Sequence, residues 1–306
     1  MNPEAPPRYP PCVTRLVLLF DSLPPSQLGC YGSDCRTPTI DSLAAEGLVF
    51  DCCYRDGDRA RSLVVESEHV EIVRLDGVPA VGDTGFLTVL PQLPAKPLAE
   101  LESLATASLG ESAAAGDRPD ERSPHVAGAR FREIAANDRG AAETLLDFEL
   151  LCCEQHIAAA DALVAEIVGA LSDTTGGEDL TVILTASRGW APTLLDDPLL
   201  DTPRHVPAIV AGGAVRPQRD ATLCTPETVI TATWSGAAHE LRYVAADGAS
   251  LRTADALYAQ RSDGEGGTIE SLFVKPADRF DRDDCSRAEP SLVGQLADRL
   301  KSIGTA

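Results

Sequence analysis

Short runs of consecutive apolar residues alternate, along the first two thirds of the chain, with segments in which apolar residues recur at helical spacing. Unbroken runs of this kind are typical of strands buried on both faces of a parallel sheet. The run at residues 13–20 predicts such a strand, and segments rich in apolar residues predict further strands at residues 48–53, 70–75, 86–90, 180–185 and 206–211. The helical spacing predicts one long helix over residues 141–171. Strands that alternate with helices indicate an α/β fold, with a doubly wound, mostly parallel sheet flanked by helices.

A second helix is predicted from its end signals. Thr37 is a favourable capping residue, Pro38 fits the first turn, and Gly47 is a common stop. We therefore expect a helix over residues 38–46 whose first turn is capped by the Thr37 side chain.

The last part of the chain has a different pattern. A helix is expected after Thr225 and Pro226, through Val229, Ile230 and Trp234. Four short segments with alternating polarity follow and predict a small antiparallel sheet at residues 241–244, 250–253, 256–259 and 271–274. A closing helix is expected over residues 290–303.

This change of pattern predicts two domains, an α/β domain at residues 1–236 and a small C-terminal α+β subdomain at residues 237–306. Residues 109–138 are rich in Ala, Gly, Ser, Asp and Arg and show little apolar periodicity. We interpret them as a mobile insertion in the first domain.

The net charge of −21 limits the partners of the protein. It argues against nucleic acid and anionic membranes, and it disfavours anionic substrates unless local cations override the field. The simplest interpretation is that the charge serves solubility. No apolar run approaches the roughly 20 residues that a membrane helix needs, and no basic segment precedes an apolar stretch at the start. We expect a cytoplasmic protein whose partner is unknown.

The nine cysteines show no metal-binding spacing. None belongs to a Cys-Xaa-Xaa-Cys pair, and the adjacent pairs at residues 52–53 and 152–153 do not match a zinc ribbon. We expect most of them to be reduced, buried thiols that pack as small hydrophobic groups.

A series of ordered motifs carries a family resemblance. The chain reads Arg-Leu-Val-Leu-Leu-Phe-Asp-Ser-Leu at residues 15–23, Leu-Gly-Cys-Tyr-Gly at 28–32 and Thr-Pro-Thr-Ile-Asp-Ser-Leu-Ala-Ala-Glu-Gly at 37–47. This series resembles the amino-terminal signature of the sulfatase family, within the alkaline-phosphatase superfamily. Weaker matches follow in the family's order, at residues 179–189, 205–213, 250–253 and 270–278. The resemblance implies the sulfatase-like α/β fold with its C-terminal subdomain.

The resemblance also implies a divalent cation, normally calcium, held by oxygen ligands at the ends of two strands. Asp21 matches the first ligand. Ser22, Ser187 and Arg188 stand where the other ligands are expected, and Arg has no lone pair for a metal. The sequence therefore predicts only a remnant of the site at Asp21, and no bound cofactor.

The family's nucleophile motif, Cys/Ser-Xaa-Pro-Xaa-Arg, is absent. Cys52 and Cys53 lie near the expected place, but Pro and Arg do not follow at the required spacing; residues 59–62 are a looser possibility. The family's Asp-Pro-His reads Leu-Pro-Ala at residues 93–95. His205 either lines the remnant pocket or is a hydrogen-bonding surface residue. No catalytic residue is assigned.

Two functions remain in competition. The first is a catalytically inactive pseudo-sulfatase with a binding or unknown role, and the second is a diverged hydrolase of sulfuric or phosphoric esters that uses a non-standard site around Asp21. A gene product without a selected role stays open as well. One structural hypothesis is that Arg188 occupies the space of the lost cation and pairs with Asp21; the alternative is that Arg188 points to solvent.

Overall fold

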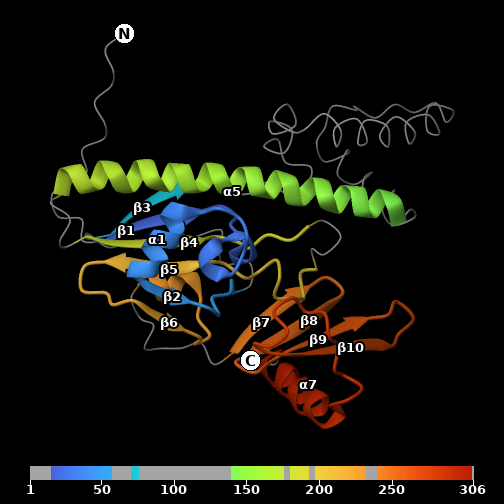
Figure 1. The fold of residues 1–306 in the computed structure, drawn as a ribbon. Helices are drawn as coiled ribbons and strands as arrows, with labels where there is room; N and C mark the ends of the chain where they lie inside the picture. The colour runs from blue at the N-terminus through green and yellow to red at the C-terminus, as the bar shows by residue number, and fades with distance from the viewer. Residues whose placement is uncertain are drawn as a thin grey trace.

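The protein is described by a computed structural model that covers residues 15–56, 70–75, 139–175, 180–192, 197–231 and 240–304. Six described strands form the larger sheet: β1 Arg15–Phe20, β2 Leu48–Phe50, β3 Val70–Leu75, β4 Thr181–Ala186, β5 Ala208–Gly212 and β6 Gln218–Asp220. Their order in space is β3-β1-β4-β5-β2-β6 (Figure 1). β1 runs parallel to β3 and β4, and β2 runs parallel to β6, whereas β5 is antiparallel to both of its neighbours. The predicted mostly parallel sheet is confirmed.

The position of β1 explains its unbroken apolar sequence. It lies between β3 and β4, and residues 16–20 are at most 1% exposed. A strand buried on both faces cannot alternate polar and apolar side chains, because each polar one would lose its water. β1 is therefore the centre of the main core.

The long helix α5 (Arg139–Thr175) lies along the larger sheet and packs against α1 (Pro38–Glu46), as Figure 1 shows. Its buried side chains include Cys153, Ile157 and Val164, which recur at helical spacing. Leu163, next to Val164 in the same helix, is 36% exposed.

The cap of α1 differs from the prediction. The Thr37 side chain makes no capping hydrogen bond; its hydroxyl instead accepts from the Gly29 N–H and donates to Asp41. The free N–H groups of the first turn are bound by Asp161 of α5, whose carboxylate accepts from Ile40 N at 2.8 Å and from Thr39 N at 3.3 Å. The start of the helix was predicted correctly. The predicted capping residue, Thr37, was wrong, because the acceptor is Asp161 from a distant segment of the chain.

Replacing Asp161 by alanine is expected to lower the free energy of unfolding by about 1 to 2 kcal/mol, because two N–H groups of the first turn lose their acceptor and water has little access to them. Urea unfolding measures the change. Asp147→Ala is the control, since Asp147 lies exposed on the same helix, and it should change stability by less than about 0.5 kcal/mol. Equal effects of the two substitutions would show that Asp161 does not cap α1.

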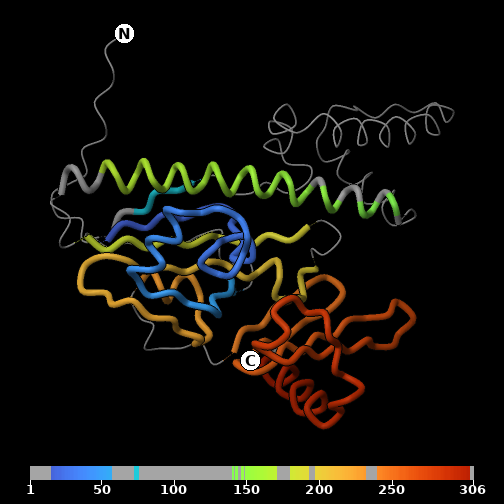
Figure 2. Tube along the Cα trace, viewed as in Figure 1, coloured from blue at the N-terminus to red at the C-terminus, as the bar shows by residue number. Residues whose placement is uncertain are grey.

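The C-terminal part of the chain forms a second sheet. Its strands are β7 Glu240–Ala245, β8 Gly248–Thr253, β9 Ala256–Ser262 and β10 Thr268–Val274, all antiparallel to their neighbours. Helix α7 (Pro290–Gly304) buries Val293, Leu296 and Leu300 against this sheet. In Figure 2 residues 240–304, orange to red, form a lobe beside the larger sheet.

Four charged side chains inside the protein, each at most 1% exposed, connect this lobe to the segment before β5. Arg252 Nε donates to Asp201 Oδ2 at 2.7 Å, Lys275 Nζ lies 3.5 Å from the same oxygen, and Lys275 also pairs with Asp281. Asp281 in turn accepts from Asp201 N at 2.9 Å. Burial alone would lower the pKa of Arg252, but the carboxylate of Asp201 raises it above its ordinary value. Two cations and two anions thus neutralise one another in the junction.

Several predicted features fall where the structure gives no description. These are the strand at residues 86–90, Trp234, the insertion at residues 109–138 and the domain boundary between residues 236 and 237.

The strand β6 was not predicted at all, and the expected strand at residues 48–53 ends at Phe50. Cys53 and Tyr54 instead form isolated bridges to Cys224 and His205.

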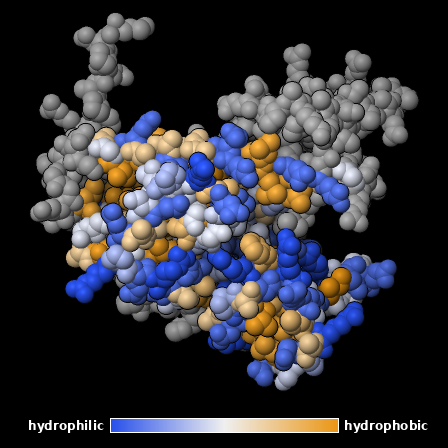
Figure 3. Space-filling model, viewed as in Figure 1, coloured by the Kyte–Doolittle hydropathy of each residue, from blue (hydrophilic) through white to orange (hydrophobic). Residues whose placement is uncertain are grey.

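Hydrophobic residues are interspersed with hydrophilic ones on the face in Figure 3. The large apolar residues of the described surface that are at least 36% exposed are distributed over α5, β7, β10 and the segment after β10: Leu163, Val244, Ile269, Val274 and Phe280. Among the described helices, none combines the length and the apolar character that a membrane crossing requires.

Candidate functional site

The carboxyl ends of β1, β3 and β4 meet at one edge of the larger sheet. Asp21 N donates to Leu75 O at 2.9 Å, and Ser187 N donates to Phe20 O at 2.7 Å. Leu23 N donates to the carbonyl of Arg188 at 3.2 Å. Ligands of α/β sheets bind at this edge, because the polar segments that follow the buried strands converge there. The residues that the sequence singled out therefore lie on adjoining segments.

The side chains at this edge are in different environments. Asp21 and Arg188 are exposed, and Ser187 is half-buried. Ser22 is 1% exposed, and its hydroxyl donates to the Gly189 carbonyl at 2.9 Å. A side chain at Gly189 would meet the His205 carbonyl, since an added Cβ would lie 2.3 Å from that oxygen. The Ser22 side chain therefore connects the end of β1 to the loop after β4 by a hydrogen bond and is not available to a ligand in solvent.

The hypothesis of an ion pair between Asp21 and Arg188 is not supported. The strands β1 and β4 are neighbours, as expected, but the ion pairs recorded for the described part of the chain do not join these two residues. The argument for the pair was that a carboxylate left in a partly buried cleft needs a counter-charge. Because Asp21 is exposed to water, that need does not arise.

The described side chains at this edge do not fit the calcium ion that the sulfatase resemblance implies. Calcium takes six to eight oxygen ligands, several of them carboxylates. Here Asp21 offers one carboxylate, the Ser22 hydroxyl is directed to Gly189, and Arg188 offers a cation. Within the described residues, no group of three or more His, Cys, Asp or Glu side chains could hold a metal ion.

The thiols near the expected nucleophile position are buried. Cys52 is 6% exposed and Cys53 is fully buried. Burial raises the pKa of both thiols above the ordinary value, and for Cys53 a hydrogen bond with Cys224 raises it further. The nucleophilic form of cysteine is the thiolate, so both are poor nucleophiles at neutral pH. Arg59, Arg61 and Ser62, the looser candidates, lie outside the described residues.

His205 is a bonded, partly buried residue at the same edge. Its Nε2 lies 3.0 Å from the Asp51 carbonyl oxygen, so this nitrogen carries the proton. The ring stacks on Tyr54, with centroids 4.7 Å apart. Burial lowers the pKa of His205 from 6.5 to about 4, so the imidazole is neutral at pH 7. The hydrogen bond expected of His205 is present, but its ring packs on Tyr54 and is not a freely exposed surface group.

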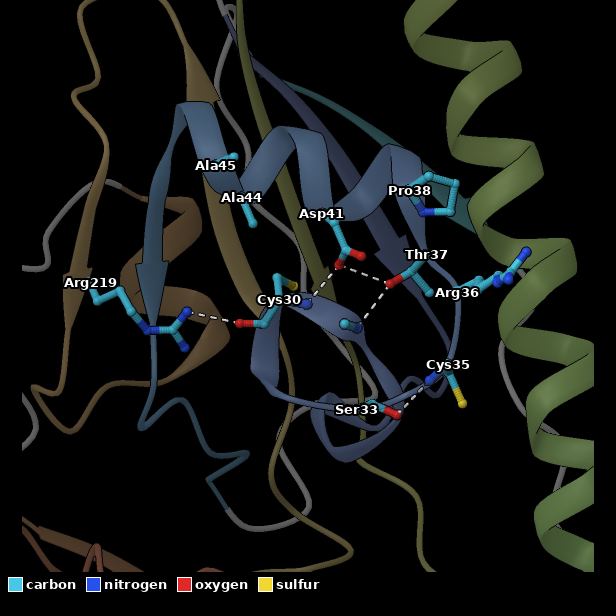
Figure 4. Close-up of a pocket in the computed structure, with 11 residues that line it drawn as sticks. Cys30, Ser33, Cys35, Arg36, Thr37, Pro38, Asp41, Ala44, Ala45 and Arg219 are labelled. Carbon is cyan, nitrogen blue, oxygen red and sulfur yellow. Dashed lines mark hydrogen bonds between the residues drawn. The ribbon is translucent and has the colours of Figure 1, made fainter.

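A pocket of about 720 Å³ lies beside α1 and was not foreseen from the sequence (Figure 4). Asp41 points toward its floor, where Oδ1 accepts from Cys30 N at 2.6 Å and from the Thr37 hydroxyl at 2.9 Å. Arg219 of β6 borders the pocket; it donates to the Cys30 carbonyl at 2.8 Å and pairs with Asp51. The Asp41, Thr37 and Arg219 side chains at this pocket are thus already hydrogen-bonded within the protein.

The comparisons with known proteins agree on the fold. No family model and no curated protein matches the sequence. Among solved structures, a 2-O GAG sulfatase is similar over 95% of this chain and 91% of that chain, with a TM-score of 0.58 and 13% identity. A putative sulfatase, yidJ from Bacteroides fragilis, is similar over 98% and 97%, with a TM-score of 0.58 and 12% identity. The phosphonate monoester hydrolase of Agrobacterium radiobacter is similar over 95% of each chain, with a TM-score of 0.54 and 11% identity.

The chain therefore has the α/β fold of the sulfatases and of a phosphonate monoester hydrolase, as its amino-terminal motifs indicated. A fold does not determine an activity. Any activity of this chain depends on the residues at its own site.

Proposed function

We propose that this chain is a pseudo-sulfatase, a protein that keeps the sulfatase scaffold for binding and no longer hydrolyses sulfate or phosphate esters. The observation that carries the proposal is the donor set at the carboxyl edge of the larger sheet. One exposed carboxylate, Asp21, stands beside a hydroxyl already bonded to the backbone, and Arg188 follows the neighbouring strand. These groups cannot replace the several oxygen ligands that polarise a bound ester.

The environment of the thiols supports the same proposal. Hydrolysis through a covalent intermediate needs an activated nucleophile that is open to the substrate. Cys52 and Cys53 are buried and have raised pKa values. A cation site and an open nucleophile would be lost by independent changes, so the lack of both among the described residues favours a binding role over a weakened enzyme.

Binding of a divalent cation gives the first test. Apart from any effect of screening the net charge, adding calcium or manganese is expected to change the melting temperature by less than about 1 °C. A ligand that binds only the folded state at 100 times its Kd would stabilise by about 2.7 kcal/mol, which corresponds to several degrees.

Asp21→Asn separates the two sources of any shift. Because the protein carries a net charge of −21, divalent cations can stabilise it by screening alone, and that effect should be the same in the wild type and the variant. A shift of several degrees that is lost in Asp21→Asn would contradict the proposal. It would instead support the diverged hydrolase, which the exposure of Asp21 to solvent would permit.

A further inference from the structure

Two cysteines that are far apart in the sequence lie opposite each other in the protein interior. Tyr54 N donates to the Cys224 carbonyl at 2.9 Å, and Cys224 N donates to the Cys52 carbonyl at 3.0 Å. These two hydrogen bonds place Cys53 and Cys224 as partners in an isolated parallel bridge. Both are buried, with 0% and 1% of their surface exposed.

The bridge gives the two thiols a geometry suited to a covalent bond. Neighbouring strands lie about 4.8 Å apart, and side chains at paired positions point to the same face. A disulfide forms without backbone movement when the Cα atoms are between about 4.4 and 6.8 Å apart. Cys53 and Cys224 are paired positions of such a bridge, and the neighbouring Cys224 thiol helps burial to raise the pKa of the Cys53 thiol. The backbone pairing thus brings the two residues to neighbouring-strand distance with their side chains on the same face.

The other neighbouring thiols are arranged differently. Cys30 and Cys35 both line the pocket beside α1, but burial and the neighbouring carboxylate of Asp41 raise the pKa of the Cys30 thiol, and Cys35 Sγ lies 3.1 Å from Gln27 Oε1. Cys152 and Cys153 are adjacent in α5, where successive side chains point in different directions.

We propose that Cys53 and Cys224 are an oxidation site, at which a small peroxide converts the dithiol into an intramolecular disulfide. The bond would join the segment after β2 to the segment before α6 (Pro226–Ile230). It would thereby fix the edge of the sheet at the place where the sulfatase resemblance expects the nucleophile. The inference does not depend on the proposed function, because it concerns thiols that the pseudo-sulfatase reading leaves unused.

The reaction balances with hydrogen peroxide as the oxidant. One thiolate attacks a peroxide oxygen, the O–O bond breaks, and a first water leaves after protonation, which yields a sulfenic acid. The second sulfur then attacks the sulfenic sulfur, the S–O bond breaks, and a second water leaves. Two thiols lose their hydrogens, and the peroxide is reduced to two waters. Burial raises the pKa of the Cys53 thiol, so the first step is slow at neutral pH.

Mass spectrometry of the full chain tests the proposal. The reduced protein is treated with hydrogen peroxide, alkylated with N-ethylmaleimide under denaturing conditions and digested without reductant. We expect a peptide containing Cys53 linked to a peptide containing Cys224, and a rise in melting temperature of about 5 to 10 °C that dithiothreitol reverses.

Variants make the result specific. Cys53→Ser and Cys224→Ser should each abolish the cross-link and the rise in melting temperature. If the serine variant at residue 224 does not fold, Cys224→Ala replaces the thiol without adding a polar group to the core. Cys285→Ser is the control: Cys285 is half-buried and lies before α7 in the C-terminal lobe, so this variant should keep both effects.

The proposal is overturned by full alkylation of Cys53 and Cys224 after peroxide treatment, because both thiols would then have stayed reduced. It is overturned equally by sulfinic acid at either residue without a cross-link, or by cross-links that join other cysteines in place of this pair.

Discussion

Arg252→Met is expected to lower the free energy of unfolding by about 3 to 5 kcal/mol, since it removes one partner from a buried ion pair and leaves a carboxylate without its main counter-charge. The guanidinium donates to Asp201 Oδ2 at 2.7 Å, and both side chains are 1% exposed. Asp201 precedes β5 of the larger sheet, whereas Arg252 belongs to β8 of the C-terminal lobe. The loss should therefore weaken the attachment of the lobe.

Urea unfolding at pH 7 measures this effect, and Arg261→Met is the matched control. Arg261 lies on β9, the neighbouring strand, and pairs with Asp197 at 2.6 Å, but its side chain is 36% exposed. Surface ion pairs of this kind contribute at most about 1 kcal/mol. If Arg252→Met cost no more than Arg261→Met, the buried charges would not hold the lobe in place.

Replacing His205 by phenylalanine is expected to remove a large part of the acid sensitivity of the protein. In the folded state the pKa of His205 is lowered from 6.5 to about 4, chiefly by burial. The unfolded chain therefore binds more protons than the folded one in this window, so stability falls as the pH falls from 6.5 to about 4 and is fully present above 6.5. The shift corresponds to about 3 kcal/mol.

The measurement is a series of urea unfolding curves between pH 7 and pH 4 for the wild type and His205→Phe. Phenylalanine keeps a ring beside Tyr54 but loses the hydrogen bond to the Asp51 carbonyl, so the variant should be less stable at pH 7. Below pH 6.5 its stability should decline less steeply than that of the wild type. Parallel curves would show that His205 does not titrate in this window.

The sequence predicted β1 and β4 because each is dominated by consecutive apolar residues. Such a segment has few alternatives to a strand buried on both faces, and β1 and β4 are buried along nearly their whole length. The edge strand β6 has the sequence Gln-Arg-Asp and follows no apolar pattern. It is a strand because its backbone pairs with β2. Three polar residues alone do not predict such a pairing.

Contacts between distant residues account for the other differences. Thr37 satisfied the local rule for a capping residue, yet the carboxylate of Asp161 in α5 takes the free N–H groups of α1. Asp201 and Arg252 would each be expected at the surface, because charged residues are rarely fully buried. Their burial follows from a pairing that the sequence does not reveal.

The candidate site was predictable in position and only partly in geometry. The resemblance to the sulfatases placed Asp21, Ser187 and Arg188 at strand ends, and these strand ends adjoin in the sheet. The expected pair of Asp21 with Arg188 rested on the assumption of a buried carboxylate. The exposure of Asp21 depends on how the loops pack around the sheet edge, and the residue types at this edge do not predict that packing.

Hydrolysis of p-nitrophenyl sulfate and p-nitrophenyl phosphate tests the central claim most directly, with calcium or manganese present and the Asp21→Ala variant assayed in parallel. If the chain is a pseudo-sulfatase, the wild type and Asp21→Ala will release p-nitrophenol at the same background rate, and a chelator will not change it. Turnover by the wild type that exceeds the variant by tenfold or more, and that a chelator abolishes, would contradict the account and establish a metal-dependent hydrolase centred on Asp21.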